Sequence, residues 1–429
     1  MTTRKIDAAW DALESQYHIL QTVQANDVAI LTAGQITALG AIKPDIKFEA
    51  RLLTHFDNRQ EQPEFFNKND LSIFPTTRGT YAIGHFSPYA SVPDIAGLPV
   101  KHVPPITLES AVTGLRFNES MGLNYALATG ILKDFVGEEL TGTVAGRHSG
   151  GKWGYSVKSG STMIPLSVDN PQIEIDGGYE GAGSLVLVEA KNKTVGEFNL
   201  RQLYYPYRAW ASRVKKPVRT VFAAISGDDF FLFEYEFPNP MIFEAKATKN
   251  RCHYIIDSET FHKAEIWKMI TATSTLPEPQ YPFPQANSPI TTMDIISFIA
   301  ANPGSTCDDI AAYIGFDPRQ ADYYCNSAAY FGFLERDKSA HGVFALTQLG
   351  AAWSSASKRT QKELFIKALL AKRVFRESIE WWLANDAAPD KIVVGGLMKK
   401  AGLNLGPSLQ ERRSSTVRKW VKWLSELCV

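Results

Sequence analysis

The sequence is poor in cysteine, in long apolar runs and in net charge. Its four cysteines are far apart and fit neither zinc-binding nor redox spacings, so we expect buried thiols, a reducing cytosol and no structural metal. They are Cys252, Cys307, Cys325 and Cys428. No apolar run approaches the ~20 residues that span a bilayer, which predicts a soluble, intracellular protein. The 45 basic residues balance 45 acidic ones, so no overall field attracts nucleic acid.

Charge is nevertheless distributed unevenly along the chain. Residues 351–429 carry 15 Lys and Arg against 7 Asp and Glu, so the rest of the chain has a matching negative excess. A length of 429 residues predicts two to four domains with sizeable cores. We therefore expect a multidomain globular protein whose C-terminal part is basic.

A glycine-rich hairpin is the most informative stretch of the sequence. Residues 172–176 alternate between polar and apolar side chains, and residues 185–191 form a second apolar run that is interrupted only by Glu189 and Lys191. If Asp176 lies opposite Glu189, the centre of the hairpin falls between Ala182 and Gly183, in the flexible stretch. This register predicts that Asp176, Glu189 and Lys191 converge.

Two carboxylates and a lysine at one strand end have a definite chemical use. The carboxylates repel one another and become tolerable when a divalent cation with a preference for oxygen lies between them. The lysine can orient a water molecule or stabilise a pentavalent phosphate. The pattern indicates phosphodiester hydrolysis, and an ordinary hairpin with a salt-bridged edge is the alternative.

The segments after the hairpin add context. Residues 197–208 are predicted to form a helix after a polar lead-in, and Gln202 on this helix would face the metal site. Two apolar runs, 218–226 and 229–236, predict another hairpin. Residues 110–136, upstream of the hairpin, are predicted to be mainly helical, so the predicted order is helix, hairpin, helix and strands.

This order and spacing resemble the PD-(D/E)xK nuclease superfamily, with Asp176 as the first acid and Glu189-Ala190-Lys191 as the E-x-K element. The stretches 172–179, 189–192 and 201–208 resemble a group of bacterial type II restriction endonucleases more specifically. That resemblance extends to residues 48–57 and 71–79, and so covers most of the chain. The Gln and Tyr residues of 201–208 match the signature of a subset of these nucleases.

The resemblance implies a site-specific, Mg²⁺-dependent endonuclease that hydrolyses double-stranded DNA. It implies a type II restriction-modification system, a DNA methyltransferase as functional counterpart and a location in the bacterial cytoplasm. The implied catalytic residues are Asp176, Glu189, Lys191 and Gln202, of which Asp176 and Glu189 bind the metal. One such site cuts one strand and the sequence holds one set, so we expect a homodimer on a two-fold symmetric target.

Several further residues are secondary candidates. Glu119, near a helix start, occupies the place where the superfamily often has an additional acid, or it is a simple helix N-terminal charge. Glu174 lies two residues before Asp176 and is either the true ligand or an outer partner. For Arg51, Asp57 and Arg78 the sequence leaves two interpretations open: ion pairs within a packed N-terminal region, or contact with DNA.

Three regions are candidates for DNA contact. The glycine-bounded loop 147–152 suits phosphate or groove contacts through Arg147, Ser149 and Lys152, or it is a solvated hairpin loop. After a proline-rich linker, three predicted helices and a short hairpin resemble a winged helix, a fold that reads a DNA groove or docks proteins. Its exposed readers would be Arg319, Gln320, Asp322 and Tyr323.

The last predicted helices carry clustered basic residues that suit phosphate neutralisation. The candidates are Arg412, Arg413, Arg418, Lys419 and Lys422. Trp420 and Trp423 lie among them and are expected to belong to a core. This part is a candidate second helix-turn-helix unit.

The sequence thus predicts an α/β (α+β) nuclease core of the PD-(D/E)xK type with a helical N-terminal region and a C-terminal winged-helix or helix-turn-helix domain. The expected divisions are an N-terminal helical or mixed region that is a candidate for DNA contact (1–105), the nuclease domain (106–273), the linker (274–290), the winged helix (291–353) and a basic helical domain (354–429). One alternative is a repair or branched-DNA nuclease of the same superfamily. Another is a non-catalytic winged-helix regulator, against which the intact Asp176, Glu189 and Lys191 argue.

Overall fold

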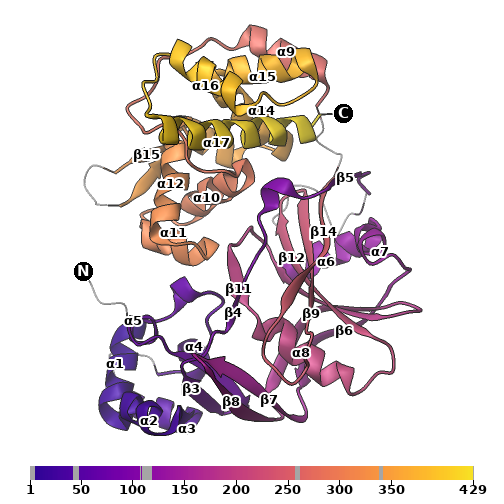
Figure 1. Cartoon of the computed structure of the whole chain (residues 1–429), viewed down its shortest axis with the longest axis vertical. Helices are drawn as coiled ribbons and strands as arrows, with labels where there is room; N and C mark the ends of the chain where they lie inside the picture. The colour runs from indigo at the N-terminus through magenta and orange to yellow at the C-terminus, as the bar shows by residue number, and fades with distance from the viewer. Residues whose placement is uncertain are drawn as a thin grey trace.

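A computed structural model describes residues 5–41, 48–106, 108, 118–256, 261–337 and 342–428. It shows a mixed α/β protein, with N-terminal elements, a central sheet and C-terminal helices in different parts of the molecule (Figure 1). In the N-terminal part, the sheet β1-β3-β2 is antiparallel and packs with several helices around Trp10. These elements are α1 (Lys5–Tyr17), α2 (Ile19–Asn26), β1 (Val28–Thr32), α3 (Ala33–Ala38), η1 (Leu39–Ala41), α4 (Ala50–Leu53), η2 (Arg59–Glu61), α5 (Glu64–Lys68), β2 (Ser72–Thr77) and β3 (Thr80–Gly84).

The central sheet has seven strands in the order β5-β14-β13-β12-β10-β9-β6. The pairs β10–β12 and β14–β5 are parallel and the other neighbours are antiparallel, so the sheet is mixed. The strands are β5 (Val100–Val103), β6 (Thr141–Ser149), β9 (Gln172–Glu180), β10 (Leu185–Lys191), β12 (Val218–Ser226), β13 (Asp229–Glu236) and β14 (Lys246–Ile256). Two smaller pairs accompany it, β4 (Tyr89–Ser91) with β11 (Glu197–Asn199) and β7 (Lys152–Ser159) with β8 (Thr162–Asp169).

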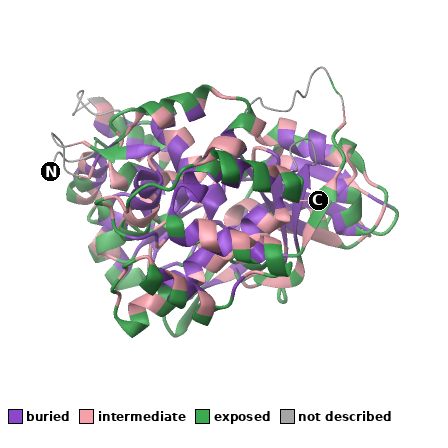
Figure 2. Ribbon diagram, turned by 90° about the horizontal axis from the view of Figure 1, so that it is seen from above, coloured by how far each residue is buried: buried purple, intermediate pink, exposed green. Residues whose placement is uncertain are grey.

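Helices cover both faces of the central sheet because the sheet strands carry apolar residues on both sides. Leu185 and Leu187 belong to the larger core, with α8 (Arg201–Ala211). Val186 and Val188 belong to a separate core, with α6 (Glu119–Ala128) and α7 (Ile131–Val136). Figure 2 shows buried residues running through the interior of the molecule.

The elements predicted around the hairpin are present, but some of their bounds differ from the prediction. The strands 185–191, 218–226 and 229–236 are confirmed. The strand expected over residues 172–176 continues to Glu180, because Gly177 and Gly178 pair with Val188 and Leu187 and do not begin the turn. The expected helix 197–208 begins only at residue 201, because residues 197–199 pair with β4. A helix was also expected from residue 110 to 136; residues 110–117 lie outside the described residues, and the rest is broken at Gly130, where the backbone is left-handed (φ 78°).

The C-terminal part begins with three helices and a two-stranded hairpin, in the order predicted. They are α10 (Pro289–Ala301), α11 (Cys307–Ile314), α12 (Pro318–Tyr330), β15 (Leu334–Arg336) and β16 (Phe344–Leu346). The side chain of Asp317 caps α12 by accepting a hydrogen bond from the amide of Arg319, with Pro318 in the first turn. The remaining helices are α13 (Gln348–Ser355), α14 (Lys358–Leu370), α15 (Arg373–Asn385), α16 (Lys391–Lys400) and α17 (Pro407–Glu426).

Residues 291–353 and 354–429, which the sequence pattern separates, share one core. The rings of Phe331 and Trp420 lie 4.8 Å apart, and those of Phe331 and Phe365 6.3 Å apart. The proline-rich segment packs into the same core, where Ala286 O accepts a hydrogen bond from Trp420 Nε1. Helix α9 (Lys263–Ala272) also joins these helices, through an ion pair between Arg359 and Glu265. A continuous core therefore fixes the C-terminal helices to one another.

Two findings bear on the composition. Within the described ranges, no helix is both long enough and apolar enough to cross a membrane. All four cysteines are free thiols; Cys252 and Cys325 are buried, as expected, whereas Cys307 and Cys428 are partly exposed.

Candidate functional site

The β9–β10 hairpin places two acids at the same level of the sheet. Its ladder runs from Glu180–Leu185 to Gly177–Val188, which is the register predicted from the sequence. Asp176 and Glu189 are the next residues beyond the last pair. There the backbone pairing of the two strands ends, and the Ala190 amide instead donates a hydrogen bond to Asp176 Oδ2 at 2.9 Å.

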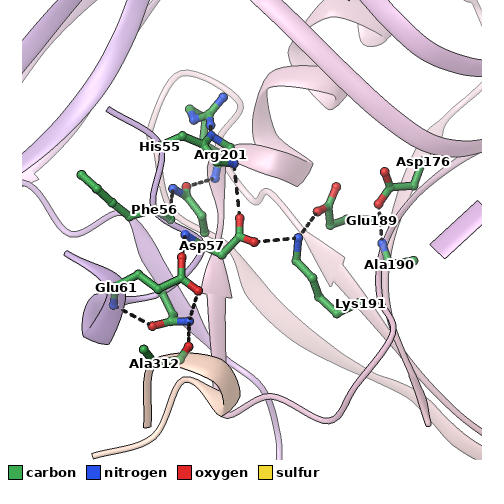
Figure 3. Close-up of polar contacts among 12 residues, drawn as sticks. His55, Phe56, Asp57, Glu61, Asp176, Glu189, Ala190, Lys191, Arg201 and Ala312 are labelled. Atoms are coloured by element: carbon green, nitrogen blue, oxygen red, sulfur yellow. Dashed lines mark hydrogen bonds and ion pairs between the residues drawn. The ribbon is translucent and has the colours of Figure 1, made fainter. Parts of the chain in front are cut away.

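Glu189 and Lys191 point to the same face of β10 and are both buried. Their relative exposures are 4% and 8%, values that are rare for charged residues without a partner. Lys191 Nζ donates a hydrogen bond to Glu189 Oε1 at 2.9 Å (Figure 3). The E-x-K element therefore forms a buried ion pair at the edge of the hairpin.

Burial and charge shift the pKa of each of these groups. Burial raises the pKa of Glu189, an effect that Lys191 opposes and the Asp176 charge reinforces. Burial also raises the pKa of Asp176, opposed by the Ala190 hydrogen bond. For Lys191, burial lowers the pKa, but Glu189 and Asp57 outweigh it and the net shift is upward. The raised pKa values thus disfavour the charged form of the two acids and favour the charged form of the lysine beside them.

The two secondary acids differ in position. Glu119 is at the start of α6, where Asn118 accepts a hydrogen bond from the Met121 amide. Burial raises its pKa, and the charges of Lys191 and Asp176 act on it, so it is within electrostatic reach of the cluster. Glu174 is exposed and lies 3.6 Å from Arg147 on the neighbouring strand, outside the contacts of the cluster.

Helix α8 packs against β9 and β10 and carries Arg201 and Gln202. The side-chain oxygen of Gln202, Oε1, is buried and has no hydrogen-bond partner within the described residues. A buried amide oxygen without a partner is costly, so it is a natural acceptor for a bound ligand or water. Arg201 Nη2 is 3.1 Å from His55 Nδ1.

The segment 55–61 of the N-terminal part enters the site, which the sequence did not indicate. Asp57 Oδ2 lies 3.4 Å from Lys191 Nζ, and Asp57 Oδ1 lies 3.3 Å from His55 Nε2 (Figure 3). Glu61 Oε2 accepts a hydrogen bond from the Asp57 amide at 3.0 Å. Of the two alternatives for Asp57, the structure favours the ion pair, whereas Arg51 and Arg78 are exposed. The only available signal was the resemblance across residues 48–57.

The loop that follows Lys191 is held by the C-terminal helices. Thr194 donates a hydrogen bond to Asp294 on α10 at 2.7 Å, and Asp294 also accepts one from Ser226 at 2.5 Å. Lys193 Nζ lies 4.0 Å from the centre of the Tyr313 ring on α11. The candidate site is therefore built from all three parts of the chain.

The expected glycine-bounded loop 147–152 is reduced to residues 150–151, because Arg147 and Ser149 lie on β6 and Lys152 begins β7. These three candidates for DNA contact all have partners within the chain. Arg147 lies against Glu174, Ser149 Oγ donates a hydrogen bond to Asn170, and Lys152 pairs with Asp169 at 2.9 Å. Arg147 and Lys152 remain mostly exposed. The loop is at the edge of the sheet next to β9, the strand of Asp176.

The candidates on α12 are at its first turns. Arg319 and Gln320 are exposed and Tyr323 is partly buried. Asp322 forms an ion pair with Arg336 of β15 at 2.8 Å. This contact ties the helix to the hairpin that follows it.

The basic residues of α17 are largely engaged within the chain. Arg413 is buried, Arg418 donates a hydrogen bond to Pro389 O at 2.9 Å, and Lys419 pairs with Asp94 at 2.9 Å. Lys422 pairs with Glu426 and Arg412 is exposed. Trp420 and Trp423 are buried, which confirms their expected place in the core.

The oxygen donors of the hairpin suit a hard cation. Across the described residues, no three His, Cys, Asp or Glu side chains gather closely enough to hold a metal by themselves. Mg²⁺ does not need such a cage, because it keeps several waters and uses one or two carboxylates together with substrate phosphates. Asp176 and Glu189 at the end of the hairpin match that requirement.

Three family models match consecutive parts of the chain, and each is described as a domain of unknown function. Residues 7–83 match DUF6996, residues 84–255 match DUF6997 and residues 291–429 match DUF7226. No curated protein and no solved structure matches the chain. The three matched stretches correspond to the N-terminal, central and C-terminal parts, all of which contact residues 191–194.

Proposed function

We propose that this protein is a Mg²⁺-dependent, site-specific endonuclease that cuts double-stranded DNA, as in a type II restriction-modification system. The observation that carries the proposal is the cluster at the end of the hairpin, in which the partly buried Asp176 lies beside the buried pair Glu189 and Lys191. Phosphodiester hydrolysis adds water to phosphorus and breaks one P–O ester bond. It therefore requires a positive environment for the developing phosphate charge and an oriented water.

Each residue of the cluster has a role in this chemistry. Asp176 and Glu189 would hold Mg²⁺, which when bound neutralises phosphate charge and makes water a better nucleophile. Lys191 is charged and buried, so its field acts on the phosphate with little screening by water. Glu119, which feels the charges of Lys191 and Asp176, and Gln202, whose side-chain oxygen is buried without a partner, would orient water molecules.

The surroundings support DNA as the substrate. The exposed residues Arg147, Lys152, Arg319 and Arg412 offer phosphate contacts. The order of α10–α12 and the β15–β16 hairpin is that of a winged helix, which supplies the groove-reading element. A homodimer would place one site on each strand of a symmetric target, with a methyltransferase protecting the host DNA.

Plasmid digestion tests the proposal directly. The wild-type protein with Mg²⁺ is expected to give discrete DNA bands, and a chelator should abolish them. Asp176→Ala and Lys191→Ala should each reduce the cleavage rate by at least about 10²–10³-fold, because each removes a group that acts on the transition state. DNA binding in a gel-shift assay should change little, and circular dichroism should show that each variant is still folded, although Lys191→Ala lowers the melting temperature because it removes the partner of the buried Glu189.

Glu174→Ala is the matched control, since Glu174 is an exposed acid on the same strand as Asp176. It should cleave at the wild-type rate. Full activity of Asp176→Ala, or loss of activity in Glu174→Ala alone, contradicts the assignment of the site. Cleavage only at branched junctions would instead support a repair nuclease.

A further inference from the structure

The position of Asp57 is fixed by contacts on both sides of its segment. Asn199 Nδ2 donates a hydrogen bond to Phe56 O at 3.0 Å, and the Arg59 amide donates one to Glu197 at 2.6 Å. Asn58 Nδ2 donates to Ala312 O of α11 at 2.9 Å (Figure 3). The segment is thus held between the central part and the C-terminal part.

Lys191 has two anionic partners that differ in origin. Glu189 is 2.9 Å away on the same strand, and Asp57 is 3.4 Å away on a segment of the N-terminal part. Under the proposed function Glu189 is also a metal ligand, and a carboxylate that coordinates a cation attracts a neighbouring ammonium less strongly. Lys191 then needs a second anion that is not on the metal-binding hairpin.

We propose that Asp57 is the positioning residue of Lys191, holding its ammonium group towards the scissile phosphate while Glu189 binds the metal. This inference rests on the proposed endonuclease function and adds a requirement to it. The N-terminal part supplies a component of the catalytic centre, in addition to any contact that it makes with DNA.

His55 and Arg201 hold Asp57 in turn. Arginine only donates hydrogen bonds, so His55 Nδ1 accepts from Arg201 and its proton is on Nε2, which faces Asp57 Oδ1. Arg201 engages Nδ1, whereas Nε2 approaches Asp57 Oδ1 to 3.3 Å without a well-aligned hydrogen bond, so His55 contacts Asp57 but does not satisfy that oxygen. The chain of contacts runs from Arg201 through His55 and Asp57 to Lys191.

Steady-state cleavage kinetics of full-length variants test the role of Asp57. Asp57→Asn should reduce kcat about 10²-fold with KM nearly unchanged, because a misplaced catalytic group costs rate more than binding. Asp57→Glu should restore part of the rate, since it returns the negative charge. His55→Gln should stay active because glutamine can accept from Arg201 and donate to Asp57, whereas His55→Leu should lose rate.

Glu64→Gln is the control, because Glu64 forms an exposed pair with Lys68 in the same part of the chain. It should leave kcat unchanged. A wild-type kcat in Asp57→Asn overturns the inference, and so does an equal loss in Asp57→Asn and Asp57→Glu accompanied by a lowered melting temperature.

A double-mutant cycle separates this inference from the proposed function. The melting temperatures of Asp57→Asn, Lys191→Met and the double variant should be non-additive, whether or not the protein cuts DNA. Additive shifts overturn the Asp57–Lys191 contact. If the variants show non-additive melting temperatures but the folded wild-type protein does not cut DNA, the proposed function is overturned, and with it the catalytic role of Asp57.

Discussion

The β9–β10 hairpin and helix α17 are both conspicuous in the sequence for their charged residues, but they use these residues differently. On the hairpin, Asp176, Glu189 and Lys191 gather in a buried cluster. On α17, Arg418 and Lys419 reach separate partners elsewhere in the chain. The difference shows that a run of charges indicates a site only when the backbone directs its members to one point.

The geometry of the two elements explains this contrast. Residues two apart on a strand share a face, and a hairpin register places a third residue opposite them. A long helix packed among others distributes its charges around its circumference, so the charges face several neighbours. The following predictions test whether α17 is structural and the hairpin region functional.

The largest effect is expected from Trp420→Ala on α17. Trp420 packs against Phe331 and Phe365 and donates a hydrogen bond to Ala286 O. Its loss leaves a cavity, and we expect the free energy of unfolding to fall by about 3–5 kcal/mol in denaturant titrations. Trp381→Ala is the control because Trp381 is 40% exposed, and it should cost far less. Equal small losses would contradict a structural role for α17.

A smaller effect is expected from Asp294→Ala beneath the loop that follows the hairpin. The substitution removes the acceptor for Thr194 and Ser226, and Thr194 is buried. We expect a loss of about 1–3 kcal/mol in the free energy of unfolding, together with slower cleavage, because the loop next to Lys191 is no longer held. Asp308→Ala changes an exposed acid on α11 and should alter neither quantity. An unchanged cleavage rate in Asp294→Ala would show that this contact with the C-terminal part does not contribute to catalysis.

The smallest effect distinguishes α12 from α17 in DNA binding. Arg319→Ala should weaken binding and reduce the slope of log affinity against log salt by about 0.9, the value for one phosphate contact. Arg418→Ala should leave the slope unchanged, because Arg418 is hydrogen-bonded to Pro389 O. Fluorescence anisotropy over a range of salt concentrations measures both. If Arg418→Ala reduced the slope and Arg319→Ala left it unchanged, α17 and not α12 would be the helix that contacts DNA. Point variants are preferable to removing the C-terminal part, since the proline-rich segment packs into its core.

The sequence by itself determined the local elements and the main cluster. Alternation of apolar residues indicated both strands of the hairpin, and the register that places Asp176 opposite Glu189 is the one observed. The glycines were misleading, because Gly177 and Gly178 lie inside β9 and do not end it. Asp317 and Pro318 specified the start of α12. These signals act within a few residues, where backbone geometry links side-chain spacing directly to position.

Only the tertiary structure decided which distant groups join the cluster. Asp57 reaches Lys191 because its segment is held by Asn199 and Ala312, from two other parts of the chain. The burial of Arg413 likewise follows from the helices around α17 and not from its neighbours in sequence. Such contacts depend on how separately formed elements pack, and a packed core selects among many possible pairings that leave no periodic trace in the sequence.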